Sequence, residues 1–313
     1  MKIIQHSDIL SLNISNVDCF NWVKEALSQK STSMLPPKIS MKQDGHIFYN
    51  VMPCIIENVK TAGVKVVVRK PENTPALDSQ ISLYDTDTGK IKAIMDGNFI
   101  TTMRTGAIAA LSITKFAMPN YSEIGIIGLG NTARATIDIL LDVIGDKKLN
   151  IKLYSYKDHA QLFIERYKQY KNIDFTIHST YKEIIENSDV VISSVTYADK
   201  NFGEDAWFKE GCLVVPIHTM GFQNCDLFFD KVYCDDICHV EGFKYFNKFR
   251  SISEISDVLN NTKPGRENNK ERIIAYNIGI ALQDIYFAEK IYQLCHNKGV
   301  SFELNPPTDK FWL

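Results

Sequence analysis

The 313-residue chain lacks the features that would direct it to a membrane, to nucleic acid or to an oxidising compartment. It has no apolar run long enough to span a bilayer, and its start, Met1 to Asn13, lacks the layout of a signal peptide. The 35 basic and 37 acidic side chains nearly cancel and form no basic block, so neither a nucleic-acid nor a membrane-surface partner is expected. We therefore expect a cytoplasmic protein.

Cysteine is also sparse, and the seven cysteines are odd in number and irregularly spaced. This pattern favours reduced thiols over a disulfide framework. The segment Cys234–His239 contains two cysteines, two aspartates and a histidine, but no second ligand pair lies at a spacing typical of zinc sites. We interpret it as a strand end followed by a loop, and we expect no metal.

What the sequence does contain is a strand, a glycine-rich turn and a helix in direct succession. Ile124–Ile127 is β-branched apart from one glycine, which is typical of a parallel strand buried on both faces. Gly128, Gly130 and Ala133 follow at the spacing of the Gly-x-Gly-x-x-Gly/Ala fingerprint, and the next segment has helical composition. Such a turn lets a pyrophosphate reach the N–H groups of a helix N-terminus. We predict nucleotide binding here; the alternative is a merely tight turn between a strand and a helix.

The chain before this motif is predicted to be rich in β structure. The spacing of apolar residues predicts an amphipathic helix at 17–27. Alternating apolar residues and turn signals then predict strands at 46–52 and 62–69 and a hairpin over 80–96. The pattern becomes helical at 100–116, where Arg104 stands among small and polar neighbours.

From residue 122 onward, short apolar strands alternate with helical segments. The predicted strands lie at 124–127, 151–154, 175–177, 190–193, 213–216 and 231–234. This alternation predicts a doubly wound parallel sheet whose ligand crevice lies at the carboxyl ends of its strands. A short helix at 255–259 and a long helix at 273–293, with Gly279 in its interior, are predicted to follow. Because the N-terminal β layer is too short to bury itself well, we expect the long helix to return across it.

These elements predict an α/β fold in which a Rossmann-type doubly wound parallel sheet is inserted in a discontinuous, β-rich α+β outer domain. The outer domain would comprise residues 1–118 and a returning helix and tail at 273–313, and the dinucleotide-binding domain would comprise residues 119–272.

Motifs in this order resemble the ornithine cyclodeaminase/mu-crystallin family, which also contains archaeal-type alanine dehydrogenase and several imine reductases. They extend over roughly residues 35–290 and specify the family better than the reaction. The motifs are Met52-Pro53, Gly63-Val64-Lys65, Pro71-Glu72-Asn73, Asp85-Thr86-Asp87-Thr88-Gly89, Met95-Asp96-Gly97, Arg104-Thr105-Gly106-Ala107, Gly128-Leu129-Gly130-Asn131-Thr132-Ala133, Lys263-Pro264-Gly265-Arg266 and Gly279-Ile280-Ala281-Leu282-Gln283-Asp284.

The resemblance implies a homodimer built through the outer domain and a nicotinamide cofactor on the central domain. It also implies that Lys38, Lys65 and Arg104 gather around the substrate and the nicotinamide. Three converging cations could hold the carboxylate of a small amino or imino acid. Lys65, between two valines, could have its pKa lowered by burial and act as a proton donor or acceptor. For either lysine alone, a surface role is the alternative.

By the same resemblance, cofactor contacts fall on Gln80, Arg104, Gly128, Gly130, Asn131, Thr132, Thr196, Asn277 and Ile278. The end of the second strand decides between NAD and NADP, because an acid there binds the ribose 2′-hydroxyl and repels a 2′-phosphate. Ser155 stands in place of that acid, and Lys157 could meet a phosphate, which favours NADP. The nearby Asp158 leaves NAD open.

Two acids that cyclodeaminases use are missing from this chain. The family's catalytic aspartate falls on Gln223, which cannot take up a proton at neutral pH, and an acid just before the Met-Pro pair falls on Asn50. Asp226 could replace the first acid if the loop shifts register. His218 is either another acid/base or a hydrogen-bonded structural histidine.

These departures favour an NAD(P)-dependent oxidoreductase that interconverts a small amino acid with its imino or keto form, as a dehydrogenase or imine reductase. The cofactor supplies the hydride, and water or lysine can manage the proton. One alternative is ornithine cyclodeaminase, which makes proline and ammonia, with Asp226 as the replacement acid. The other is a non-catalytic, cofactor-binding protein like the crystallin members. Candidate residues for the substrate pocket are Tyr49, Phe222, Phe311 and Trp312.

Overall fold

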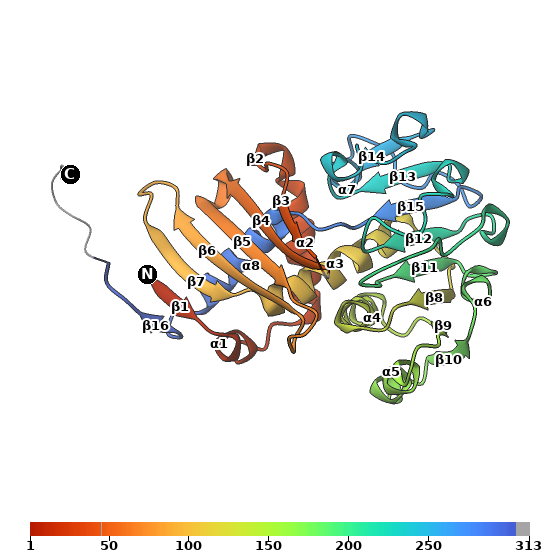
Figure 1. Cartoon of the computed structure of the whole chain (residues 1–313), viewed down its shortest axis with the longest axis horizontal. Coiled ribbons are helices and arrows are strands. Elements are labelled where there is room, and N and C mark those ends of the chain that lie inside the picture. The colour runs from red at the N-terminus through yellow and green to blue at the C-terminus, as the bar shows by residue number, and fades with distance from the viewer. Residues whose placement is uncertain (45, 305–313) are drawn as a thin grey trace. The chain divides into compact units, whose positions relative to one another are not determined.

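The structure is a computed structural model that describes residues 1–44 and 46–304, so Phe311 and Trp312 lie outside the described residues. The chain divides into two compact units, each built on its own eight-stranded sheet (Figure 1). Unit 1 comprises residues 1–14, 31–101 and the chain from 284 onward. Unit 2 comprises residues 15–30 and 102–283.

The sheet of unit 1 is mostly antiparallel, with the strand order β16-β1-β7-β6-β5-β4-β2 and β3 also paired to β4. Its strands are β1 (Lys2–Ile4), β2 (Ser33–Met34), β3 (Ile39–Gln43), β4 (Ile47–Ile56), β5 (Thr61–Arg69), β6 (Leu77–Asp85), β7 (Ile91–Asp96) and β16 (Val300–Ser301). The predicted hairpin is confirmed, since β6 and β7 pair antiparallel. At its turn, the Asp85 carboxylate accepts a hydrogen bond from the Thr88 N–H at 2.8 Å. Because turn residues form such local hydrogen bonds, the hairpin can be predicted from the sequence.

Helix α8 (Ala281–Leu294) packs against one face of this sheet. Alternate residues of β5 point to this face. Thr61 Oγ1 donates to Glu289 Oε2 at 2.9 Å, and a Cβ on Gly63 would lie 2.6 Å from Ile285 Cδ1. The glycine therefore permits the close approach of the helix. The expectation that the C-terminal helix returns to the β-rich layer is confirmed.

The sheet of unit 2 is entirely parallel, with the strand order β10-β9-β8-β11-β12-β15-β13-β14. Its strands are β8 (Glu123–Ile127), β9 (Leu149–Tyr154), β10 (Ile173–His178), β11 (Val190–Ser193), β12 (Leu213–Pro216), β13 (Lys231–Cys234), β14 (Ile252–Glu254) and β15 (Ile273–Tyr276). The helices that follow β8, β9 and β10 are α4 (Asn131–Ile144), α5 (His159–Tyr167) and α6 (Tyr181–Ile185). The chain order reverses between β8 and β11. The predicted doubly wound parallel sheet is therefore confirmed, and its switch point lies beside the glycine turn.

The prediction of one long helix over 273–293 is wrong. Ile273–Tyr276 forms β15 between β12 and β13, and α8 begins only at Ala281. Gly279 lies in the loop between them with φ +91°, a conformation that other residues rarely adopt. All four residues of β15 are buried, and a short apolar run between two strands gains more from sheet pairing than from its helical spacing.

The two units divide the chain at other points than the predicted boundaries. Helix α2 (Asn16–Ser28) belongs to unit 2, where it packs on α4 and α7 (Ile255–Leu259), and Asn16 donates a hydrogen bond to Asp142 at 2.8 Å. Helix α3 (Asn98–Phe116) begins in unit 1 and continues in unit 2, while α1 (His6–Leu10) lies wholly in unit 1. None of the helices within the described residues is both long and apolar enough to cross a bilayer.

Candidate active site

The turn after β8 has the geometry that its glycines predict. Gly128 has φ +88°, a Cβ there would lie 2.9 Å from the Ser194 carbonyl group, and Ser194 Oγ donates to Gly128 O at 2.8 Å. Gly130 is the N-cap of α4, and no described atom lies within 4 Å of a Cβ built on it. No described side chain caps α4, so its first N–H groups are available to an anion. The turn therefore fits a dinucleotide pyrophosphate.

The residues beside this turn lie at the switch point of the sheet. Asn131 is exposed and Thr132 is partly exposed at the start of α4. Thr196 is exposed just after β11, the strand next to β8. The carboxyl ends of β8 and β11 meet there, because the Ser194 N–H donates to Ile127 O at 2.9 Å. The structure thus brings these predicted cofactor residues together at one edge of one sheet.

Ser155 and Lys157 follow β9 at the same edge and are exposed. The Ser155 N–H donates to His178 O at 2.8 Å, which joins the ends of β9 and β10. Lys157 has φ +52°, and its Nζ lies 5.3 Å from the centroid of the Tyr156 ring. Asp158 is the N-cap of α5, with no side-chain cap bond among the described residues. An exposed hydroxyl and an exposed ammonium therefore flank the expected ribose position.

Asn277 and Ile278 follow β15 at the carboxyl end of β12. The Asn277 N–H donates to Pro216 O at 2.9 Å, and its side-chain oxygen accepts from Ser112 Oγ at 3.0 Å. Asn277 is buried, whereas Ile278 is partly exposed. The hydrogen bonds of Asn277 fix the start of the loop that leads to α8.

Arg104 packs against the next residue of this loop. The guanidinium of Arg104, which is 6% exposed, occupies the space that a Cβ on Gly279 would need. The Gly279 N–H donates to the carboxylate of Asp235, a fully buried residue just after β13. Asp235 was not predicted from the sequence, because its partner is a backbone group far away in the chain. The glycine and the aspartate together hold the surface on which Arg104 lies.

In unit 1, Lys65 is buried, as its apolar neighbours predict. Its Nζ lies 2.7 Å from Asp284 Oδ1, and both side chains are almost completely enclosed. Lys65 Nζ also donates to Thr101 Oγ1 at 3.5 Å. Sequence reasoning did not assign Asp284 to the site, although an acid within an apolar helical run signals a buried partner.

The other two predicted residues of unit 1 are Lys38 and Gln80. Lys38 is partly buried just before β3. Gln80 is exposed in β6, and its Nε2 donates to Asp78 Oδ2 at 2.9 Å. Gln80 pairs with Val66, whereas Lys65 pairs with Ile81, so Gln80 and Lys65 point to opposite faces of the sheet.

Asp226 does not have the surroundings of a replacement acid. It begins a 3₁₀ turn (Asp226–Phe228), is 1% exposed, and accepts a hydrogen bond from the Tyr276 hydroxyl. Its burial raises the pKa of the carboxyl to about 6, although the bond from Tyr276 opposes this shift. Tyr276 is fully buried and belongs to the apolar core of unit 2. The structure therefore favours a structural role for Asp226, because its carboxyl is enclosed beside the apolar core of unit 2.

His218 has a partner at each ring nitrogen. The Met220 N–H donates to Nδ1 at 3.2 Å, so the proton is on Nε2, which lies 2.8 Å from Ser193 Oγ. Burial lowers the pKa of His218 to about 4, which leaves the ring neutral at pH 7. These contacts favour the structural alternative. At the place of the missing acid, Gln223 Nε2 donates to Thr219 O at 2.7 Å.

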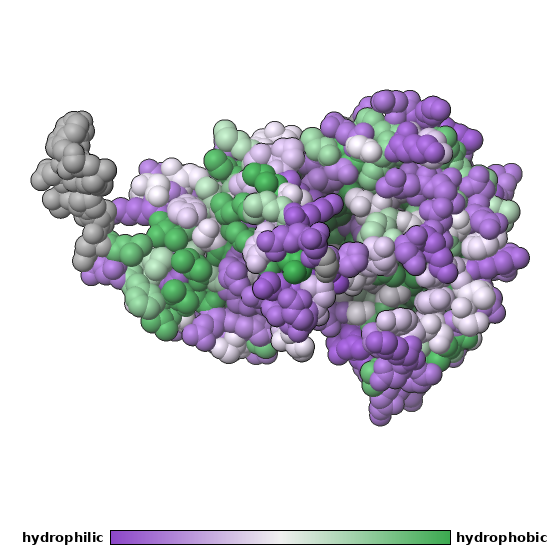
Figure 2. Space-filling view, viewed as in Figure 1, coloured by the Kyte–Doolittle hydropathy of each residue, from purple (hydrophilic) through white to green (hydrophobic). Residues whose placement is uncertain are grey.

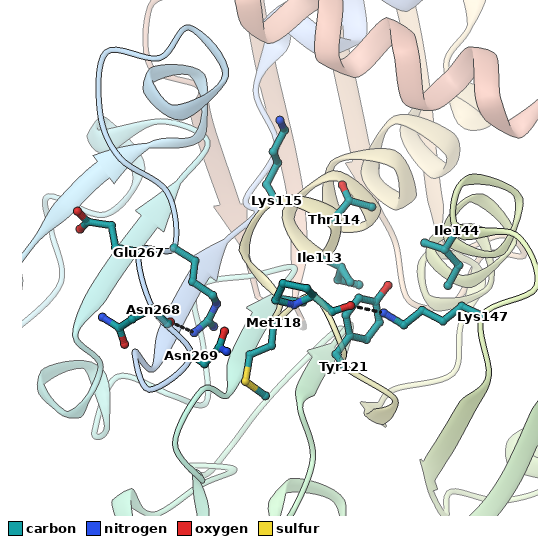
Figure 3. A pocket seen from close by; sticks show the side chains of 13 residues that line it. Ile113, Thr114, Lys115, Met118, Tyr121, Ile144, Lys147, Glu267, Asn268 and Asn269 are labelled. Carbon is teal, nitrogen blue, oxygen red and sulfur yellow. Dashed lines mark hydrogen bonds between the residues drawn. The ribbon is translucent and has the colours of Figure 1, made fainter.

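A separate cavity of about 560 Å³ contains none of the predicted site residues (Figure 3). It lies at the end of α3 and at the loops that precede β8 and β15. Its Lys147 donates to Pro119 O at 2.9 Å and lies 3.6 Å from the centroid of the Tyr121 ring. Its Arg266 donates to backbone carbonyls, including Phe116 O at 2.6 Å. Because Lys147 and Arg266 already bind backbone carbonyls, this cavity is not a better candidate for the active site.

Within the described residues, no group of three or more histidine, cysteine, aspartate or glutamate side chains is arranged to hold a metal ion. The segment after β13 instead forms a 3₁₀ turn, Ile237–His239, whose start is capped by Asp236. This matches the interpretation of that segment as a strand end followed by a loop.

Comparison with known proteins places this site in a family. Residues 1–299 match the sequence model of the ornithine cyclodeaminase/mu-crystallin family. N-((2S)-2-amino-2-carboxyethyl)-L-glutamate dehydrogenase of Staphylococcus aureus is 27% identical over 307 residues, which cover 86% of this chain and 87% of that protein.

Two solved structures are similar over nearly the whole chain. Thermococcus litoralis Δ1-pyrroline-2-carboxylate reductase, in complex with NADH and L-proline, has 25% identity and a TM-score of 0.85, with 96% of this chain and 100% of that one covered. An archaeal alanine dehydrogenase dimer with bound NAD has the same fold, with 22% identity, a TM-score of 0.85 and coverage of 97% and 99%. The chain therefore belongs to the ornithine cyclodeaminase/mu-crystallin family.

Proposed function

We propose that the protein is an NAD(P)-dependent oxidoreductase that interconverts a small amino acid with its imino or keto form. The observation that carries this proposal is the geometry at the carboxyl edge of the unit 2 sheet. There, the bare N-terminus of α4 adjoins the switch point between β8 and β11. A nicotinamide dinucleotide bound at this edge supplies or accepts the hydride. The similar reductase was solved with L-proline bound, and the similar dehydrogenase is named for an amino-acid substrate. Both names support the substrate class.

Arg104 is the cation of unit 2 that we assign to the substrate carboxylate. A guanidinium offers paired N–H donors that match a carboxylate, and burial strengthens such bonds. The glycine loop and Asp235 support the guanidinium of Arg104, which reduces the cost of ordering it when the substrate binds. In unit 1 we assign Lys65 and Lys38 to substrate binding.

The missing acids favour a single redox step over cyclodeamination. Reduction of an imine needs one hydride at carbon and one proton at nitrogen, and a lysine ammonium or water can provide the proton. Deamination needs further carboxylates. Gln223 cannot supply one, Asp226 is enclosed with Tyr276, and burial keeps His218 neutral by lowering its pKa to about 4.

We propose that the cofactor is NADP rather than NAD. Ser155 stands where an acid would repel the 2′-phosphate, and the exposed ammonium of Lys157 is two residues away. A phosphate between these groups would accept hydrogen bonds from both. The solved relatives bind NADH or NAD, so this preference would set the chain apart from them.

We also propose a homodimer built through the face of the unit 1 sheet that α8 does not cover. Register places Ile39, Val66 and Ile94 on that face, and Ile39 is 60% and Ile94 37% exposed. Hydrophobic residues gather over the strands of unit 1 (Figure 2). Large exposed apolar patches of this kind mark interaction surfaces. The alanine dehydrogenase of the same fold is described as a dimer, which supports a second copy as the occupant.

The test is absorbance at the reduced-nicotinamide band, with NADH and NADPH run separately against cyclic imines and against small 2-oxo acids with amines. Oxidation of cofactor with an imine or oxo acid, and no proline from ornithine, is the expected result. Proline formed from ornithine would instead establish the cyclodeaminase alternative. Tight cofactor binding with no turnover over the whole panel would refute an enzymatic function and favour a crystallin-like binding protein.

A further inference from the structure

Lys65 and Asp284 form an ion pair that packing alone does not explain. Their side chains are 1% and 0% exposed, and Nζ lies 2.7 Å from Oδ1. Removing two charges from water is costly, and the attraction within the pair offsets this cost only when the geometry is favourable. Two well-packed apolar side chains would hold α8 against β5 at least as well. The retention of both charges therefore points to a role for the ammonium itself.

The polar surroundings of Lys65 continue into α3. Lys65 Nζ donates to Thr101 Oγ1 at 3.5 Å, and Thr101 Oγ1 lies 3.0 Å from Ser79 Oγ. Ser79 is fully buried, so these hydroxyls form part of the interior. Asp284 of α8 and Thr101 of α3 are thus among the groups that direct the ammonium.

We infer that Asp284 is the positioning residue for Lys65. Its carboxylate compensates the charge of the ammonium in apolar surroundings and fixes the direction in which Nζ donates. In this role Asp284 touches no substrate and acts only through Lys65. The inference rests on the proposed function, in which Lys65 binds the substrate.

A second ion pair between the same helix and the same sheet provides a matched control. Lys92 Nζ lies 2.5 Å from Glu289 Oε2, and Thr61 Oγ1 donates to that oxygen at 2.9 Å. These side chains, 15% and 6% exposed, are nearly as buried as the first pair. Glu289→Gln therefore disturbs the packing of α8 on β5 without removing a partner of Lys65.

The test compares Asp284→Asn, Glu289→Gln, and the double variant Lys65→Met/Asp284→Leu with the unaltered protein. Steady-state kinetics over pH and unfolding in urea are measured for each. Asp284→Asn is expected to lower kcat/KM about 100-fold, the effect of a misplaced reacting group, and to shift its pH profile. Glu289→Gln is expected to lower stability while its kcat/KM and pH profile stay unchanged. The double variant, which leaves no unpaired charge, is expected to fold and to remain inactive.

Two outcomes would overturn the inference. If the double variant regains both stability and activity, the pair only fastens α8 to the sheet. If Asp284→Asn shows the same pH profile and kcat/KM as Glu289→Gln, Asp284 does not position Lys65. Should Asp284→Asn fail to fold, an active double variant would still overturn the inference, because neither Lys65 nor Asp284 would then be needed. Failure of the proposed function is a separate result, because the unaltered protein would then show no turnover.

Discussion

Replacing Asp226 by asparagine is expected to remove a dependence of stability on pH between about 4 and 6. Burial raises the pKa of this carboxyl from 3.8 to about 6 in the folded protein. The folded state therefore binds a proton more tightly than the unfolded state, and stability falls as pH rises through this interval. A difference of about two pKa units corresponds to roughly 3 kcal/mol, which is fully lost above about pH 6.

The free energy of unfolding at pH 7 alone tests this reasoning less well than its change with pH does. Asparagine is neutral at every pH, and its oxygen can still accept the hydrogen bond from Tyr276. Its amide group, however, would replace Oδ2, which has no hydrogen-bond partner among the described residues. A buried donor without a partner costs about 1–3 kcal/mol, which offsets most of the gain from removing the charge. The difference in free energy of unfolding between the unaltered protein and Asp226→Asn should therefore change by roughly 3 kcal/mol between about pH 4 and pH 7. This change is expected whatever the difference is at either pH.

Urea unfolding of the unaltered protein and of Asp226→Asn, at pH values from about 4 to 8, measures this difference. Glu241→Gln, at an exposed position of the same unit, is the control and should leave the pH profile unaltered. Parallel stability profiles for the unaltered protein and Asp226→Asn would refute the reasoning from burial. Turnover supplies an independent check, because Asp226→Asn is expected to keep its kcat. A large loss of kcat would restore Asp226 as the replacement acid and, with it, the cyclodeaminase alternative.

Three further substitutions test the remaining assignments. Gly279→Ala should raise KM for a carboxylate substrate about tenfold or more, because its Cβ would overlap the Arg104 guanidinium at a φ unfavourable to alanine; an unaltered KM would remove Arg104 from the substrate site. Lys157→Ala should raise KM for NADPH about tenfold and leave KM for NADH unaltered, since only the 2′-phosphate needs the ammonium; equal changes for both cofactors would contradict the proposed NADP preference. Ile94→Glu should convert a dimer to a monomer in light scattering after size exclusion, because it buries a charge in the apolar face. A dimer that survives this change would place the interface elsewhere.

Most of both sheets was predictable because the signals are local. The runs 190–193 and 213–216 form β11 and β12 with the predicted bounds, since short apolar stretches buried on both faces have few other conformations. The hairpin over 80–96 follows in the same way from its turn residues. The strand at 273–276 was missed because the apolar spacing continues without interruption into α8. Its pairing partners, β12 and β13, are far from it in the sequence, so no local pattern reports them.

The candidate site was predictable to the extent that it consists of a contiguous motif. The glycine turn after β8 has its expected conformation because Gly128 adopts φ +88°, which other residues rarely adopt. The supports of the site were not predictable in the same way. Asp235 holds the loop of Gly279, and Ser193 lies at hydrogen-bond distance from His218. These contacts join residues distant in the sequence, and they leave no periodic signal.

Asp226 and Asp284 illustrate why the role of a buried acid is hard to assign from sequence. Each is an aspartate among mostly apolar neighbours, Asp226 in a 3₁₀ turn and Asp284 in α8, and each is almost completely buried. Asp284 faces the ammonium of Lys65 at 2.7 Å, so its charge is compensated. Asp226 accepts a hydrogen bond from the phenol of Tyr276, and burial raises the pKa of its carboxyl to about 6. The surroundings of a buried acid thus depend on its partner, and this is why we propose Asp284, the acid beside Lys65, as the one that influences substrate binding.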